Sequence, residues 1–266
     1  MENNLTTSLS GLNALVCGAT SGIGKSTAIE FAELGASVTI YGRNKSKTLD
    51  TMSTLNSSKN QNHQYILGDF DNPDEINNGI RKHIKNGNNY DILINNSGGP
   101  KGGLILDTEV EDFYPAFNRH LICNHILFKA LYNGMKNNKY GRIINIISTS
   151  VKQPIEGLGV SNTIRGAVAS WAKTLSFEIG KYGITVNNIL PGYTNTDRLS
   201  ALIEAKSINI GTSKELVSNS MKKSVPLNRF GSPEETAKAL AFLASPASGY
   251  INGVNLAVDG GRLSCL

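Results

Sequence analysis

Short apolar runs alternate with helix-length amphipathic segments along the chain, and this alternation constrains the fold more than any other feature. The runs are rich in Val and Ile, which is typical of strands buried on both faces of a sheet. Such alternation predicts right-handed βαβ units, and hence a doubly wound α/β fold: a parallel sheet of about seven strands with helices on both faces. The expected strands are Asn13–Cys17, Ser37–Tyr41, Gln64–Leu67, Ile92–Ile94, Arg142–Ile147, Thr185–Leu190 and Asn255–Val258, and the clearest helical segments are Lys25–Leu34, Leu121–Met135 and Arg165–Lys181.

A chain of 266 residues is ordinary for one large α/β domain. No repeat, low-complexity tract or linker interrupts the pattern, so we predict a single domain over residues 1–266. The least regular part is Tyr193–Pro226, which is polar and precedes a helix whose N-cap we assign to Ser232. We expect residues 193–226 to form a substrate loop or lid.

The composition argues against a membrane or exported protein. Hydrophobic residues make up 39% of the chain, and no run approaches the roughly 18 apolar residues that a membrane span requires. Met1–Gly11 is polar and lacks the apolar segment of a signal peptide. The three cysteines (Cys17, Cys123 and Cys265) are scattered and odd in number, which suits a reducing compartment better than a disulfide framework. We expect a cytoplasmic protein with no membrane partner.

The formal charge of +5 raises the question of nucleic-acid binding. The Lys and Arg residues are dispersed, however, and no long basic run appears, so a solvated surface explains them better. An anionic ligand such as a dinucleotide accounts for a few of them equally well. We expect a small-molecule substrate, no nucleic acid and no metal site.

A glycine-rich turn, Gly18-Ala19-Thr20-Ser21-Gly22-Ile23-Gly24, follows the first expected strand and precedes a helix. Glycines let the chain turn tightly and bring backbone amides against a pyrophosphate, and the helix N-terminus adds positive potential. A glycine-rich turn alone is weak evidence, but the strand–turn–helix context strengthens it. The turn therefore predicts a Rossmann-like dinucleotide-binding site.

The order of further motifs resembles the short-chain dehydrogenase/reductase family. The spacing Gly18-x-x-x-Gly22-Ile23-Gly24 is the family's, with Cys17 where Thr is usual, and the resemblance extends over about residues 10–261. The other matching segments are Gly68-Asp69-Phe70, Asn95-Asn96-Ser97-Gly98 (Asn-Asn-Ala-Gly in the family), Pro191-Gly192, and Asn252-Gly253 with Val258-Asp259-Gly260-Gly261.

The resemblance implies where a dinucleotide would be held. The pyrophosphate would meet the glycine-rich turn, the adenine the end of the third strand, and the nicotinamide carboxamide the segment after the sixth strand. The cofactor residues so implied are Gly18, Thr20, Ser21, Gly22, Ile23, Gly24, Asp69, Phe70, Asn96, Ser97, Gly98, Pro191, Gly192 and Thr194.

The end of the second strand favours NADP(H) over NAD(H). Enzymes that prefer NAD place a carboxylate there, which hydrogen-bonds the ribose 2′-hydroxyl and would repel a 2′-phosphate. Here the position is Gly42, and Arg43 and Asn44 follow it. A guanidinium makes bidentate contacts to phosphate. An ordinary surface arginine is the alternative interpretation of Arg43.

The catalytic positions depart from the family's usual Ser, Tyr, Lys and Asn. Ser148 follows the fifth strand in the place of the serine. Counting from both flanks puts Ser161 in the tyrosine position, Arg165 in the lysine position and His120 in the asparagine position. A serine hydroxyl is far less acidic than tyrosine, whose pKa is about 10, so Ser161 cannot readily serve as the same acid. Arg165 keeps the charge that would hold the cofactor ribose but is a poor proton relay.

Three other side chains have two interpretations each. His120 could relay a proton, or it could be a histidine packed in its helix. Tyr193 could donate a proton, or it could be a loop aromatic that contacts the substrate. Lys152 could attract an anionic substrate, or it could be a solvated loop lysine.

The resemblance thus implies an NADP(H)-dependent oxidoreductase that acts on a carbonyl or alcohol, or on a related unsaturated substrate, with an atypical active site. An NADP(H)-binding pseudoenzyme or sensor, and a non-redox isomerase or dehydratase on the same scaffold, are the alternatives. Fold analogy cannot separate them, because the site rather than the scaffold sets the chemistry. The family also implies a homodimer or homotetramer.

Overall fold

The computed structural model describes residues 6–265, and its seven strands form one parallel sheet in the order β3-β2-β1-β4-β5-β6-β7. Each strand begins and ends within one residue of the range that the sequence predicts. The order reverses between β1 and β4, which is where doubly wound sheets bind ligands at the carboxyl ends of their strands. The strands are β1 (Asn13–Cys17), β2 (Ser37–Gly42), β3 (Gln64–Leu67), β4 (Ile92–Asn95), β5 (Gly141–Ile146), β6 (Ile184–Pro191) and β7 (Asn255–Val258).

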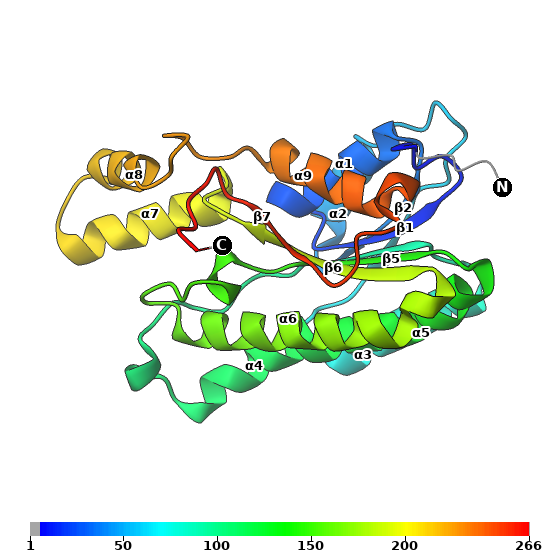
Figure 1. The fold of residues 1–266 in the computed structure, drawn as a ribbon, viewed down its shortest axis with the longest axis horizontal. Coiled ribbons are helices and arrows are strands. Elements are labelled where there is room, and N and C mark those ends of the chain that lie inside the picture. The colour runs from blue at the N-terminus through cyan, green and yellow to red at the C-terminus, as the bar shows by residue number, and fades with distance from the viewer. Residues whose placement is uncertain (1–5, 266) are drawn as a thin grey trace.

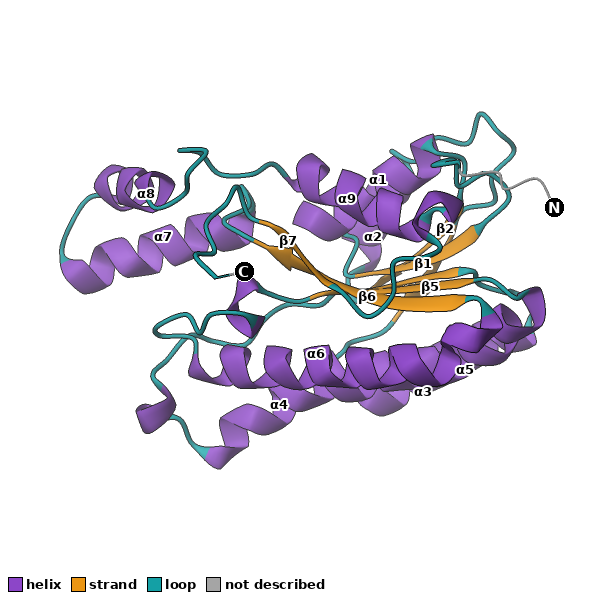
Figure 2. Cartoon of the chain, in the orientation of Figure 1, coloured by secondary structure: helices purple, strands orange, loops and turns teal. Residues whose placement is uncertain are grey.

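Helices cover both faces of the sheet, so the predicted α/β class is confirmed (Figure 1). One layer contains α1, α2 and α9, and the other contains α3, α5 and α6 (Figure 2). The α-helices are α1 (Gly22–Glu33), α2 (Lys45–Met52), α3 (Pro73–Lys85), α4 (Phe113–Phe117), α5 (Cys123–Asn138), α6 (Gly159–Ile179), α7 (Asp197–Ile210), α8 (Lys214–Lys223) and α9 (Pro233–Ala244).

The hydrophobic core lies on the two faces of the sheet, because neighbouring residues of a strand point to opposite sides. Ile94 and Ile144 pack against the layer that contains α1 and α9, whereas Leu93 and Ile143 pack against α5 and α6. All four side chains are fully buried. Burial on both faces explains why the strands are continuous Val/Ile runs rather than alternating patterns. Within residues 6–265, no helix combines the length and apolar character needed to cross a bilayer.

Four asparagines form a hydrogen-bonded ladder across the sheet. Asn95 donates to Asn145 at 2.8 Å, Asn145 donates to Asn188 at 2.8 Å, and Asn188 donates to Asn255 at 2.7 Å. These residues are also backbone register partners on β4, β5, β6 and β7. The ladder therefore fixes the relative positions of the strands that lead into the site.

Two helices occupy the segment that the sequence marked as least regular. The prediction missed α7 and α8, whose N-caps are the side chains of Thr196 and Ser213. Leu199 and Val217 pack between them in a small apolar cluster. Each helix buries only two apolar side chains, Leu199 and Ile203 in α7 and Val217 and Met221 in α8, and these are too few to stand out in a polar segment. By contrast, the helix predicted from Ser232 begins there with a complete capping box.

Helix α6 starts at Gly159, six residues before the predicted boundary at Arg165. Its first turns bury Val160 and Ile164 against Ala116 of α4. The extra turns place Ser161 and Arg165 on the helix itself, one turn apart. Both side chains consequently have fixed positions relative to the sheet.

Candidate functional site

The turn between β1 and α1 has the backbone that the sequence predicts. Gly18 and Gly22 have φ angles of +58° and +50°, which side chains rarely tolerate. A Cβ on Gly24 would lie 2.2 Å from the carbonyl oxygen of Gly18, so the turn requires glycine there. Ser21 precedes α1 and makes no side-chain capping bond. Its hydroxyl and the first amides of α1 are therefore available to an anionic ligand.

Asn96 supports the turn rather than facing away from it. Its Nδ2 lies 3.2 Å from the carbonyl oxygens of both Cys17 and Gly18. Two residues later, a Cβ on Gly98 would meet no atom within 4 Å. The end of β4 thus braces the glycine-rich turn and leaves open space beside it.

The end of β2 is closely packed at Gly42 and exposed at Arg43. A Cβ on Gly42 would lie 3.0 Å from side-chain atoms of Thr20 and Thr48. The guanidinium of Arg43 lies 3.5 Å from the carboxylate of Asp69, and both side chains are solvent-accessible. Asn44 caps α2, because its Oδ1 accepts from the amide of Lys47 at 3.0 Å. The end of β2 therefore brings together the N-terminus of α2, the guanidinium of Arg43 and Gly42, which has no carboxylate.

The structure separates Phe70 from the other predicted cofactor residues. The residue is 92% buried, and its ring packs edge-on against Tyr41 at a centroid distance of 5.6 Å. The side chain thus belongs to the core, which the sequence could not distinguish from a ligand contact. Asp69, in contrast, is solvent-accessible.

The segment after β6 packs against the segment after β7. A Cβ on Gly192, which follows Pro191, would lie 2.6 Å from Cα of Asp259, so these two motifs pack tightly against each other. Thr194 is buried, and its hydroxyl donates to the carbonyl of Gly192 at 3.3 Å. The motifs predicted from distant parts of the sequence therefore lie at one edge of the sheet.

Ser148 and Arg165 lie at the end of β5. Ser148 precedes a short 3₁₀ turn, and its Oγ accepts from the amide of Ser150 at 3.1 Å. Arg165 is 92% buried, and its Nη1 donates to the carbonyl of Ile146 at 2.9 Å. Burial, followed by the charges of Arg198 and Arg119, lowers the pKa of Arg165 to about 9. The side chain therefore remains positively charged at neutral pH.

His120 is held in a π-helical turn, η3 (Asn118–Ile122), between α4 and α5. π-Helical turns are rare in proteins, and those that occur often lie at functional sites. Its Nδ1 lies 2.7 Å from the hydroxyl of Ser97, and its Nε2 is buried without a hydrogen-bond partner in the described chain. Burial, and then the charge of Arg165, holds the pKa of His120 well below its usual value. The imidazole is neutral at pH 7.

Two further arginines, which the sequence did not single out, lie beside His120 and Arg165. Arg119 donates through Nε to Asp71 at 2.7 Å and through Nη1 to the carbonyl of Gly98 at 3.0 Å. Arg198, in the first turn of α7, donates to the carbonyls of Gly99 and Pro100 at 3.3 and 3.5 Å. Arg198 comes from a polar segment without a recognisable motif, so only the tertiary structure reveals it.

Tyr193 and Lys152 lie next to the C-terminal tail. Arg262 donates to the hydroxyl of Tyr193 at 3.0 Å and stacks on its ring at 4.3 Å. The carbonyl of Lys152 lies 4.0 Å from Sγ of Cys265. The tail thus binds the tyrosine hydroxyl, while the ammonium group of Lys152 makes no hydrogen bond or ion pair among residues 6–265.

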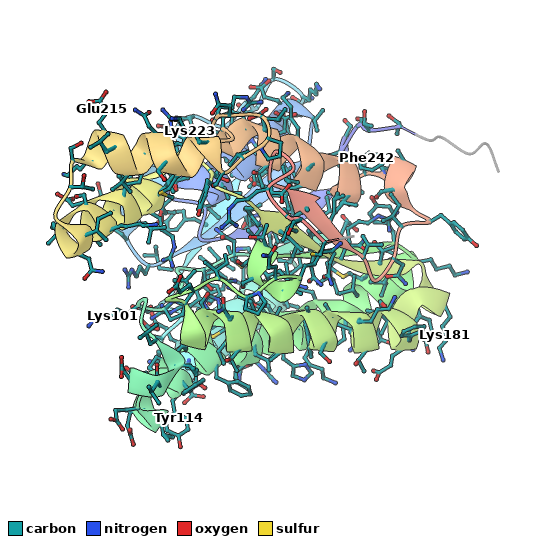
Figure 3. The ribbon with its side chains drawn as sticks, turned by 60° about the vertical axis from the view of Figure 1, so that its left-hand side comes forward. Lys101, Tyr114, Lys181, Glu215, Lys223 and Phe242 are labelled. Carbon is teal, nitrogen blue, oxygen red and sulfur yellow. The ribbon has the colours of Figure 1, made fainter. Side chains whose placement is uncertain are left out.

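A cavity of about 870 Å³ lies between α7, α8 and the start of α9. Its lining includes Ser200, Lys222 and Phe230 but not Ser148 or His120. Figure 3 shows Glu215 on α8 and Lys101 in the loop after β4 at one end of the molecule, with Lys181 at the other. The helices that line this cavity therefore project at the same end as the loop that Arg198 contacts.

A glycine-rich turn at the reversal point of a parallel sheet defines a dinucleotide-binding α/β protein. The chain belongs to the short-chain dehydrogenase/reductase family, as the motifs indicated, and the family model described as enoyl-(acyl carrier protein) reductase matches residues 18–262.

Known relatives cover nearly the whole chain. The 3-oxoacyl-[acyl-carrier-protein] reductase of Chlamydia trachomatis is 33% identical and covers 93% of this chain and 96% of its own length. An NADPH-dependent reductase of Bacillus subtilis is 29% identical, with 97% and 100% covered. The crystal structure of L-sorbose reductase from Gluconobacter frateurii, complexed with NADPH and L-sorbose, has a TM-score of 0.91 at 27% identity and covers 98% and 99%.

Proposed function

We propose that the protein is an NADP(H)-dependent oxidoreductase that reduces a carbonyl or a related unsaturated substrate. The observation that carries this proposal is a buried, neutral His120, which is held by Ser97 and leaves Nε2 without a partner in the described chain. A buried polar atom without a partner costs about 1–3 kcal/mol, which a substrate oxygen would offset. The relatives named above include NADPH-dependent reductases.

The residues around the glycine-rich turn fit a dinucleotide. Gly24 allows the close approach of α1, Ser21 has a free hydroxyl, and the space beside Gly98 is open. Gly18, Thr20, Gly22 and Ile23 would hold the pyrophosphate, while Thr194 would meet the nicotinamide amide. Bound NADPH would supply the hydride that the substrate accepts.

Arg43 and the N-terminus of α2 would hold the 2′-phosphate. The ion pair of Arg43 with Asp69 is exposed and therefore weak, so the guanidinium can turn to a phosphate at little cost. Asp69 would then be free of Arg43 and would contact the adenine. The absence of a carboxylate at Gly42 removes the repulsion that an NAD-type site imposes.

Three groups would stabilise the reacting oxygen. Reduction adds a hydride to carbon and moves an electron pair to oxygen, which must then receive a proton. The Ser148 hydroxyl donates to that oxygen. With Ser97 donating to Nδ1, His120 carries its proton on Nε2 and donates as well, as a neutral imidazole can. The positive charge of Arg165 lowers the energy of the developing anion.

The proton would come from water. Ser161 is insufficiently acidic, and protonated His120 is disfavoured by burial and by the neighbouring arginines. An anion that persists until water protonates it suits an unsaturated carbonyl compound, whose enolate is less basic than an alkoxide. The enoyl reductase description of the matching family model agrees with this second substrate type.

A substrate screen that follows NADPH oxidation tests the proposal. Paired ketones and α,β-unsaturated ketones of the same carbon skeleton would be compared, with Ser148→Ala and His120→Ala as variants. We expect turnover that falls about tenfold or more in each variant, since each donor removed costs a charge-stabilising hydrogen bond. Tight NADPH binding with no turnover on any compound would instead favour a cofactor sensor, and substrate conversion without NADPH oxidation would favour an isomerase.

A second part of the proposal concerns residues 193–226. Helices α7 and α8 would act as a lid over the substrate, with Tyr193 at its base. Arg198 already links α7 to the loop after β4. Deleting Lys214–Lys223 should raise KM for the substrate while NADPH binding is kept.

A further inference from the structure

The site contains more positive charge than the described protein neutralises. Arg119 has a carboxylate partner in Asp71, as its hydrogen bonds show. Neither Arg165 nor Arg198 has a carboxylate within 4.0 Å among residues 6–265. The ribose hydroxyls assigned to Arg165 above are neutral, so they leave its charge uncompensated.

Hydrogen bonds bring two of the guanidinium groups to the segment that holds His120: Ser97 contacts His120, and Arg119 and Arg198 donate to the carbonyls of Gly98 and Gly99. Arg165, Arg119 and Arg198 all lower the pKa of His120, and Arg198 is the largest charge acting on Arg165. Arg165 is buried, and a buried cation without a counter-ion is costly. An anionic ligand at this place would remove that cost, and the free energy so gained would strengthen the binding of the ligand.

Arg198 is held in position for such a ligand. It extends from the first turn of α7 to the loop after β4, where two backbone carbonyls accept from its Nη atoms. A Cβ on Gly99 would lie 2.5 Å from Nη2, so the side chain packs directly on a residue without one. The guanidinium is solvent-accessible, and Nε makes no hydrogen bond within the described residues. A ligand can therefore reach it from solvent.

The unpartnered Nε2 of His120 is independent evidence for a ligand with oxygen atoms. His120 is 98% buried, and its Nε2 has no hydrogen-bond partner among the described residues, whereas its Nδ1 is bonded to Ser97. The site thus offers two kinds of contact. The neutral imidazole of His120 can donate to one substrate oxygen, and the guanidinium groups of Arg165 and Arg198 suit a second, negatively charged group. A molecule with a carbonyl and a carboxylate satisfies both.

We propose that the substrate carries a carboxylate and that Arg198 is the residue that selects it. The inference rests on the proposed reductase function and names its substrate class. Guanidinium groups bind carboxylates through two parallel, charge-assisted hydrogen bonds. Arg165 adds its positive charge from the end of β5, where it donates to the carbonyl of Ile146.

A contact between Arg198 and the cofactor diphosphate is the competing role. Thr196, two residues earlier, lies 3.1 Å from the Cβ position of Gly22 in the glycine-rich turn. The two roles differ in what they predict, because a diphosphate contact would change NADP⁺ affinity in the absence of any substrate. A carboxylate contact would leave that affinity unchanged.

Calorimetric titration of the NADP⁺-saturated protein tests the carboxylate site without requiring turnover. The probes are acetate, oxamate and benzoate, with benzamide as the uncharged counterpart of benzoate. We expect at least one carboxylate to bind, and benzoate to bind about tenfold or more tightly than benzamide, which corresponds to a charged hydrogen bond. Arg198→Gln should abolish this preference, and Arg198→Lys should retain part of it because it keeps the charge but loses the planar fork.

Two controls keep the result specific. Arg81→Gln removes a charge from exposed α3 and should leave all probe affinities as in the wild type. NADP⁺ affinity should change less than about twofold in Arg198→Gln. Equal binding of benzoate and benzamide, no binding of any carboxylate, or a loss of NADP⁺ affinity in Arg198→Gln would each overturn the inference. Failure of the protein to bind NADP(H) at all would instead overturn the proposed function.

Discussion

The hydroxyl of Ser97 lies 2.7 Å from Nδ1 of His120, which joins the end of β4 to the π-helical turn before α5. Family resemblance implies Ala at the first position and Asn at the second. The two departures from the pattern thus contact each other and form one unit. The hydrogen bond orients the imidazole and leaves Nε2 without a partner in the described chain, while burial and then the charge of Arg165 lower the pKa of His120.

The first prediction concerns stability against pH. Because His120 has a lowered pKa when folded, the unfolded chain binds a proton that the folded chain does not, once the pH falls below about 6.5. The free energy of unfolding should therefore decrease below this pH, by at most about 1.4 kcal/mol per pH unit from this residue. His120→Asn should remove that part of the slope in urea unfolding series.

His125 provides the control for this series. It is an exposed histidine on α5, and His125→Asn should keep the slope of the wild type. A wild-type slope in His120→Asn as well would show that His120 is not the group whose charging is suppressed.

The second prediction concerns Ser97 as a positioning residue. Ser97→Ala should lower kcat by up to about tenfold, the worth of one hydrogen bond, with little change in KM. Ser97→Thr keeps a hydroxyl and should restore most of the rate. Nitrogen NMR of the His120 imidazole gives a readout independent of catalysis, because loss of the bond should release the tautomer to a mixture. An unchanged tautomer in Ser97→Ala would contradict this role.

The sequence predicted those parts of the site that depend on local structure. The turn at Gly18 and Gly22 requires positive φ angles, so residue type and conformation are tied together. The strands were found within one residue because burial on both faces makes them continuous apolar runs. The sheet then necessarily brings the ends of β1 and β4 together.

The sequence could not predict those parts that depend on tertiary contacts. The ring of Phe70 packs against Tyr41 in the core although its motif suggested a cofactor contact. Arg198 belongs to a polar segment, and its importance follows from its reach to Gly99 rather than from any motif. The pairing of Ser97 with His120 joins residues 23 positions apart, and no periodicity encodes it.

The third prediction concerns the asparagine ladder. Asn145 is fully buried and bonds to a neighbour on each side. Asn145→Leu should lower the free energy of unfolding by about 2–4 kcal/mol, because the amides of Asn95 and Asn188 each lose a partner in the core. Asn255→Ala at the exposed end should cost clearly less, since water replaces the lost partner. Equal losses in urea unfolding would show that the ladder does not act through burial.

The fourth prediction concerns the choice of cofactor. Gly42→Asp should weaken NADPH binding by about tenfold or more and improve NADH binding, because a carboxylate repels the 2′-phosphate and can bind the 2′-hydroxyl. Any side chain here also crowds Thr20 and Thr48, so Gly42→Ala is the matched control for packing. Fluorescence titration of both cofactors gives the ratio. A ratio that changes equally in both variants would mean that packing, not charge, decides.

The fifth prediction separates the placement of Arg198 from its charge. Gly99→Ala adds a methyl group whose carbon would lie 2.5 Å from Nη2, so the flexible guanidinium must shift away from Gly99 while the protein keeps the arginine. The variant should lose carboxylate binding to nearly the extent of Arg198→Gln, without a matching loss of thermal stability. Gly103→Ala, in the same loop but with open space at its Cβ, should bind like the wild type. Full carboxylate affinity in Gly99→Ala would show that the position of the guanidinium over Gly99 is not the one that binds the substrate.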